Sequence, residues 1–123
     1  MQTRQPLLRV TLFAALVGLA TVNCGKSDES ESGELVAPTE LAAKVLPGPA
    51  VHLTWRDTPS EHHYSIERKS GAEAFKEVGT EVFNTTAYHD ANVVPGTTYT
   101  YRIAGVKMTL EKGPYSSEVT ITP

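Results

Sequence analysis

Residues 93–103, VVPGTTYTYRI, constrain the fold more than any other stretch of the sequence. A Pro-Gly pair at residues 95–96 marks a turn, and a run rich in β-branched and aromatic side chains follows it at once. In that run Tyr99, Tyr101 and Ile103 occupy alternate positions, which is the pattern of a β-strand with one face in a core. Tyr99 also stands three residues after the turn glycine, where a β-sandwich carries a tyrosine corner with a buried ring and a hydroxyl bonded to the preceding loop. The stretch therefore predicts one corner and one central strand of a β-sandwich.

The chain after residue 36 repeats this alternation in short runs. Apolar side chains share one face in Val51, Leu53 and Trp55, in Tyr64 and Ile66, and again in Val119 and Ile121. Turn residues separate the runs, and no segment shows the period of a helix. We expect seven short strands, near residues 37–41, 51–55, 64–68, 75–78, 86–90, 99–103 and 119–121. Such a series predicts an all-β, seven-stranded Greek-key sandwich over residues 37–123.

Several of these residues together resemble a fibronectin type III domain. The resemblance rests on Pro38 and Leu41, Trp55, Tyr64 to Arg68, Tyr88 and Asp90, Pro95-Gly96 with Tyr99, and Gly113-Pro114. Cys24 is the one cysteine of the chain, so no intrachain disulfide can form, and this favours the disulfide-free fibronectin type III sandwich over an immunoglobulin domain. The resemblance implies a module that binds a protein or carbohydrate partner, or serves as a spacer, with no catalytic activity and no cofactor.

The charge balance excludes one class of partner. The 123-residue chain has a formal net charge of −3, and its Lys and Arg residues do not gather in any one stretch. Nucleic-acid binding depends on a basic patch or stripe. We therefore expect no nucleic-acid partner.

The N-terminal segment has the composition of a secretory signal. Arg4 and Arg9 precede residues 10–22, an almost wholly apolar run that is shorter than the roughly 20 residues needed to span a bilayer. Cys24 stands at the end of this run, and the arrangement resembles a bacterial lipoprotein precursor. The resemblance implies a signal peptide over residues 1–23, a lipid on Cys24 and a place in the bacterial cell envelope, with Gly25 favouring the outer membrane.

Two other fates of this segment remain open. Cleavage after Ala20, with Gly18 at the small −3 position, would give a free secreted protein. Without cleavage, the segment would act as a weak membrane anchor.

Residues 24–36 form the predicted tether between the lipidated cysteine and the domain. Within it, residues 25–34, GKSDESESGE, lack any apolar side chain, and four acids against one lysine give a local charge of −3. Such a composition cannot bury enough surface to fold. A flexible chain of about ten residues has a root-mean-square reach of about 17 Å, so the tether would hold the domain off the membrane.

The sequence offers little chemistry for catalysis or metal binding. No Gly-x-Ser-x-Gly, His-Glu-x-x-His, Walker or Rossmann pattern occurs. His62 and His63, beside Asp57 and Glu61, come nearest to a metal constellation. Neighbouring side chains of an extended chain point apart, so we interpret these residues as a solvated loop. We expect neither an enzyme nor a metal site.

Met108 and Leu110 are apolar residues in an expected loop, residues 107–112. Either they pack against the edge of the sheet or they form a small contact patch for a partner. The predicted function is an envelope-anchored binding or adhesion module with Met108 and Leu110 as its partner contact. A structural spacer without a ligand of its own is the alternative.

Overall fold

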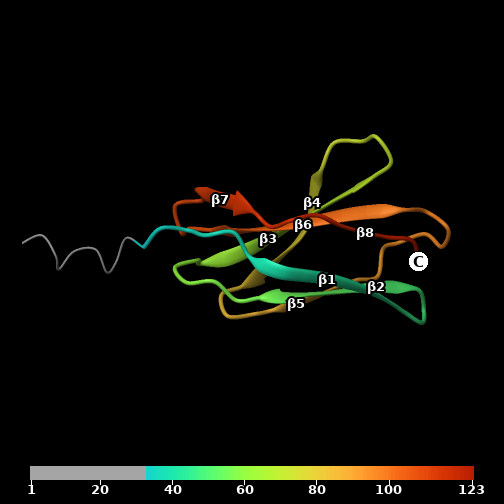
Figure 1. The fold of residues 1–123 in the computed structure, drawn as a ribbon, viewed down its shortest axis with the longest axis horizontal. Coiled ribbons are helices and arrows are strands. Elements are labelled where there is room, and N and C mark those ends of the chain that lie inside the picture. Colours follow the sequence, from blue (N-terminus) through green and yellow to red (C-terminus); the bar gives the residue numbers. More distant parts are fainter. Residues whose placement is uncertain (1–32) are drawn as a thin grey trace, which may run out of the picture. The chain divides into compact units, whose positions relative to one another are not determined.

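The computed structural model describes residues 33–123, which contain eight β-strands and no helix. The strands are β1 (Thr39–Leu46), β2 (Ala50–Arg56), β3 (His63–Ser70), β4 (Lys76–Val82), β5 (Ala87–Asp90), β6 (Tyr99–Val106), β7 (Lys112–Tyr115) and β8 (Val119–Ile121) (Figure 1). Glu34–Pro123 forms one compact unit. Residues 33–123 accordingly include no helix that could cross a membrane.

The strands form two antiparallel sheets. One sheet has the order β1-β2-β5, and the other has the order β4-β3-β6-β7 with β8 also paired to β6. The core draws on the inner faces of both sheets through Val51, Leu53, Trp55, Tyr64, Ile66, Tyr99, Tyr101 and Ile103. Each of these side chains falls on the face that the alternation predicts, because successive side chains of a strand point to opposite sides. The all-β sandwich is therefore confirmed.

The tyrosine corner is present as predicted. Tyr99 is buried, and its hydroxyl accepts a hydrogen bond from the backbone N–H of Val94 at 2.9 Å. Gly96 adopts a φ of +86°, a left-handed conformation that a side chain disfavours. The N–H of Gly96 donates to the carbonyl oxygen of Pro123 at 2.7 Å, which fixes the end of the chain against the corner.

A buried polar contact also links the two sheets. Asp90 of β5 is 2% exposed, and its carboxylate accepts hydrogen bonds from Arg68 of β3 and Tyr101 of β6, each at 2.8 Å. The N–H of Asn92 donates to the second carboxylate oxygen at 3.0 Å. Burial and the hydrogen bond to Asp90 together raise the pKa of Tyr101. Burial alone would lower the pKa of Arg68, but the hydrogen bond and the charge of Asp90 raise it on balance, so the guanidinium stays protonated.

The prediction of seven strands is wrong by one, because the lead-in to the last strand is itself a strand. Both β7 and β8 pair with β6, and residues 116–118 separate them. At the break, the hydroxyl of Ser116 accepts a hydrogen bond from the N–H of Ile103 at 3.0 Å, while the N–H of Ser116 donates to the carbonyl of Ile103 at 2.8 Å. A side-chain oxygen thus takes the place of a backbone carbonyl, and the ladder is interrupted there.

The folded unit begins before the predicted boundary at residue 37. Leu35 is buried and lies against Gly113, where a Cβ atom would stand 2.6 Å from the Cβ of Leu35. The composition of the acidic tether hid this contact, because Leu35 and Val36 at the end of a polar segment are too few to give a periodic signal. Cys24 and the predicted signal peptide lie outside the described residues.

The loops gather at two ends of the sandwich. The end where the described chain begins, here called the proximal end, carries the loops at residues 57–62, 83–86 and 107–111 (Figure 1). The turn at residues 47–49 and the corner at residues 94–97 lie at the opposite, distal end (Figure 1).

Candidate binding surface

The turn between β6 and β7 places two apolar side chains in solvent. The N–H of Lys107 donates to the carbonyl of Glu111 at 2.9 Å, and the N–H of Leu110 donates to the carbonyl of Lys107 at 2.8 Å. The side chains of Lys107 and Glu111 form an ion pair at 3.2 Å. Met108 and Leu110 are each 75% exposed at the tip of this turn. The sequence left open whether these two side chains pack against the sheet or face solvent, and the structure shows that they face solvent.

Leu110 has an unusual backbone conformation for its residue type. Its φ is +73°, in the left-handed region. Hairpin loops of this length commonly place glycine in that conformation. A bulky side chain there costs on the order of 1–3 kcal/mol. Because the side chain is also exposed, the described fold gains no core burial from leucine at this position.

A second apolar turn lies at the same end. Val82 and Phe83 follow the end of β4 and are 64% and 56% exposed. His63 of β3 pairs with Val82 on one side and with Val106 on the other, so Val82 stands in the same row as the end of β6. Glu61 connects the neighbouring loops, since its carboxylate accepts hydrogen bonds from the N–H of Asn84 and the hydroxyl of Thr58, each at 3.3 Å.

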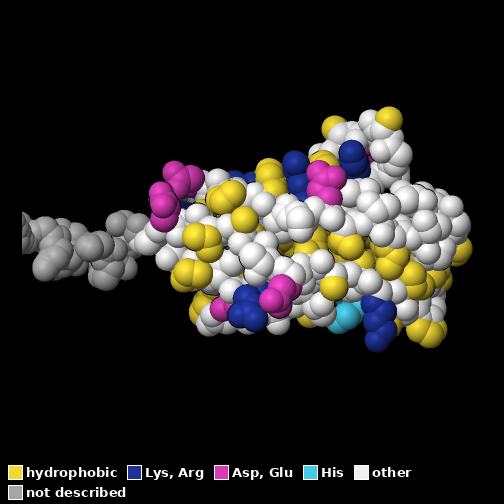
Figure 2. Space-filling model, viewed as in Figure 1, with side chains coloured by type: hydrophobic (Ala, Val, Ile, Leu, Met, Phe, Trp, Pro, Cys, Tyr) yellow, Lys and Arg dark blue, Asp and Glu magenta, His cyan; other side chains and the backbone are white. Residues whose placement is uncertain are grey.

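Exposed apolar side chains are therefore concentrated at one end of the domain. Within residues 33–123 eight large hydrophobic residues are exposed, and five of them lie at the proximal end: Val36, Val82, Phe83, Met108 and Leu110. Val45 and Val94 lie at the distal end, and Tyr115 lies on the face of the larger sheet. Figure 2 shows hydrophobic and acidic side chains next to one another at the proximal end. Single exposed apolar residues are ordinary, but a group of them marks a contact surface.

The histidines do not form a metal site in the described structure. The Nδ1 atoms of His62, in the loop before β3, and His63, the first residue of β3, lie 3.1 Å apart, which is hydrogen-bonding distance. His52 and His89 pair across β2 and β5 on the outer face of the smaller sheet, with ring centroids 6.4 Å apart. Between Gly33 and Pro123 no three His, Cys, Asp or Glu side chains come together in a way that could hold a metal ion.

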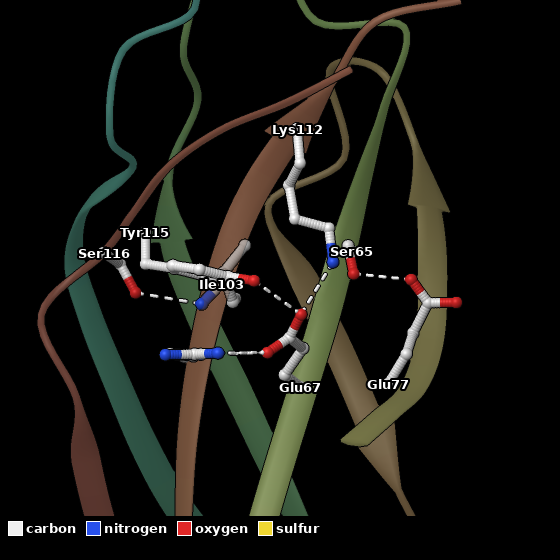
Figure 3. A network of polar contacts seen from close by, with 8 residues as sticks. Ser65, Glu67, Glu77, Ile103, Lys112, Tyr115 and Ser116 are labelled. Carbon is white, nitrogen blue, oxygen red and sulfur yellow. Dashed lines mark hydrogen bonds and ion pairs between the residues drawn. The ribbon is translucent and has the colours of Figure 1, made fainter. Parts of the chain in front are cut away.

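The outer face of the larger sheet carries a polar network that the sequence did not reveal (Figure 3). Glu67 of β3 is 6% exposed, and its two oxygens accept hydrogen bonds from Arg102 of β6 at 2.7 and 2.9 Å and from Lys112 and Tyr115 of β7 at 2.7 and 2.9 Å. Burial by itself would raise the pKa of Glu67, but the hydrogen bonds from Lys112, Arg102 and Tyr115 outweigh it and lower the pKa below its usual value. The carboxylate is fully paired, so it strengthens the sheet and is a poor acid or base.

Aromatic rings complete this network. The guanidinium of Arg102 lies between the ring of Tyr115, at 3.6 Å from its centroid, and the ring of Phe75, at 4.0 Å. Cation–π contacts of this kind contribute about 0.5–2 kcal/mol each. The one signal in the sequence was that Glu67 and Arg102 alternate with core residues on their strands, and the pairing of β3 with β6 makes them direct neighbours.

Comparison with known proteins agrees with this architecture. No known family profile matches the chain. A fibronectin type III-like protein from Clostridium thermocellum is 26% identical, with a TM-score of 0.62 over 72% of this chain and 92% of that one. The folded part of the chain is a fibronectin type III-type domain. Such a domain in human collagen XX is 18% identical, with a TM-score of 0.59 over 71% of this chain and 90% of that one.

A longer enzyme also shares sequence with this fibronectin type III-type domain. A poly(3-hydroxybutyrate) depolymerase from Ralstonia pickettii is 30% identical over 86 residues, which are 70% of this chain and 16% of the depolymerase. The chain thus spans about one sixth of that relative's length. A fibronectin type III fold is in general a binding, adhesion or spacer module and is typically not catalytic.

Proposed function

We propose that this chain is a binding module held on a bacterial envelope by a lipid on Cys24. Its partner contact is the turn that carries Met108 and Leu110. The observation that carries the proposal is the exposure of these two side chains at the proximal end, where the described chain begins nine residues after Cys24. A tether of that length keeps the turn close to the envelope surface, where a protein or carbohydrate partner would meet it.

The similarity to part of a depolymerase supports an accessory role over a catalytic one. The matching segment is 16% of that enzyme, so the shared region is a small module within it. The buried carboxylates Glu67 and Asp90 are each occupied by hydrogen bonds from neighbouring strands, which is a structural role. The function that fits these features is attachment to a partner.

Anchoring is tested by replacing Cys24 with serine. The wild-type chain should fractionate with membranes and incorporate labelled fatty acid, whereas Cys24→Ser should be released or remain as a larger precursor. A Cys24→Ser protein that fractionates and migrates like the wild type would overturn the lipid anchor.

Partner contact is tested with an immobilised domain and envelope extracts. Met108→Ser with Leu110→Ser should abolish saturable capture and leave the thermal midpoint nearly unchanged, because exposed positions contribute within about 0.5 kcal/mol. Val45→Ser with Val94→Ser, at the distal end, is the matched control and should capture normally. If neither the wild type nor the control captures anything saturable, the domain is a spacer, which is the alternative function.

A further inference from the structure

We infer that the proximal end is a docking surface for a protein segment that combines apolar side chains with lysine or arginine. This inference rests on the proposed binding function and names the chemistry of the partner. The surface consists of Val36, Val82, Phe83, Met108 and Leu110.

The apolar part of the surface is larger than the turn at Met108 and Leu110. Val82 and Val106 both pair with His63, on opposite sides of β3. Adjacent strands lie about 4.8 Å apart, so the turn after Val82 and the turn after Val106 stand about 10 Å apart. Seven residues of an α-helix rise about 10 Å. Two turns of an amphipathic helix would therefore reach from Phe83 to Met108.

The backbone gives an independent reason to assign a role to this surface. Leu110 is held in the left-handed region at φ +73°, and Asn84, beside Phe83, has a φ of +63°. Asparagine adopts this conformation readily, whereas for leucine it is rare and strained. A residue that is both strained and exposed is better explained by a contact outside the fold than by packing within it.

Charge decides what kind of partner fits. The loops of the proximal end and the lead-in to β1 carry Asp57, Glu61, Glu111 and Glu34 against Lys107, a net charge of −3 with histidine neutral. Such a rim attracts Lys and Arg and repels the anionic headgroups of a bilayer. It also repels a second copy of the same chain, so a basic amphipathic protein segment is the occupant that fits.

The test uses isotope-labelled residues 25–123, which contain every core side chain of the compact unit. Two synthetic amphipathic helices of about 18 residues serve as probes, one of leucine and lysine and the other of leucine and glutamate. The leucine–lysine peptide should shift the amide signals of residues 82–84 and 107–111, and its binding should weaken as salt is raised. The leucine–glutamate peptide should not bind.

Variants separate the apolar from the charged contribution. Phe83→Ser with Leu110→Ser should weaken the leucine–lysine peptide at least about tenfold, and Glu34→Gln with Glu111→Gln about three- to tenfold. The control, Val45→Ser with Val94→Ser, removes two apolar side chains from the distal end and should leave the affinity unchanged.

Several outcomes would overturn the inference. Shifts confined to the distal end or the sheet faces, equal binding of both peptides, or no effect of Phe83→Ser with Leu110→Ser would do so. Cosedimentation with phosphatidylglycerol vesicles in place of peptide binding would indicate a lipid surface, and concentration-dependent dimers would indicate a second copy. This protein lacks Cys24, so its behaviour is separate from the fractionation test of anchoring.

Discussion

Replacing Asp90 with alanine tests how the two sheets are held together. The change removes a buried carboxylate that accepts hydrogen bonds from Arg68, Tyr101 and Asn92. It leaves the Arg68 guanidinium, whose side chain is 22% exposed, without its counter-charge, and it strands the hydroxyl of Tyr101 in the core. The variant is therefore expected to lose stability through unpaired polar groups and not through lost apolar volume.

The magnitude follows from the burial of the three partners. Removing one member of a fully buried pair costs about 3–5 kcal/mol, and the partial exposure of Arg68 places Asp90→Ala at the lower limit, near 3 kcal/mol. The compact unit Glu34–Pro123 has 90 residues, so its free energy of unfolding is about 5–13 kcal/mol. The variant should lose a quarter or more of that stability, and its thermal midpoint should fall by about 12–24 °C.

Urea unfolding followed by Trp55 fluorescence measures the effect at pH 7. Tyr101→Phe should cost about 1–3 kcal/mol, and the double variant Asp90→Ala/Tyr101→Phe should cost less than the sum of the single variants by at least about 0.5 kcal/mol, because both remove the same hydrogen bond. Glu40→Ala is the control, since its ion pair with Arg56 is 66% exposed on both sides and should contribute less than about 1 kcal/mol. An Asp90→Ala variant within about 1 kcal/mol of wild type, or strict additivity in the cycle, would refute the reasoning.

Three further predictions concern buried hydroxyl and carboxyl groups. Tyr99→Phe should lower the free energy of unfolding in urea by about 1–3 kcal/mol, because the N–H of Val94 loses its acceptor; an unchanged midpoint would contradict the corner. Burial and the hydrogen bond to Asp57 raise the pKa of Tyr64 to about 12, above the value near 10 in the unfolded chain. The contribution of Tyr64 to the free energy of unfolding is therefore complete below pH 10, and about 2–3 kcal/mol of it is lost by pH 12. Stability measured against pH should fall less steeply above pH 10 in Tyr64→Phe, and an identical slope would be the contrary result. The pKa of Glu67 lies below its unfolded value, so the contribution of Glu67 to stability is present above about pH 4.3 and is lost as the pH falls through the folded pKa. The stability of Glu67→Gln should therefore fall less steeply with acid than that of the wild type. An equally steep fall in both proteins would exclude this role.

The sequence alone settled the features that depend on local period and turn chemistry. The alternation of Tyr99, Tyr101 and Ile103 fixed which side chains enter the core, since a strand allows only two faces. The Pro-Gly pair before Tyr99 was sufficient for the corner, because the turn and its hydroxyl contact lie within six residues of one another. The composition of residues 1–36 supports the signal and tether predictions, and the lipid on Cys24 stays a prediction.

Tertiary structure decided the features that depend on contacts between distant residues. Glu67 meets Arg102, Lys112 and Tyr115 only because strands 35 to 48 residues apart in sequence are brought side by side in register. Leu35 joins the fold because Gly113 leaves room for it, and an acidic segment gives no hint of that room. The sequence left both burial and exposure open for Met108 and Leu110, since two apolar residues in a loop have no period. The hydrogen bonds that close residues 107–111 over an ion pair direct both side chains into solvent, and only the folded turn could settle where they lie.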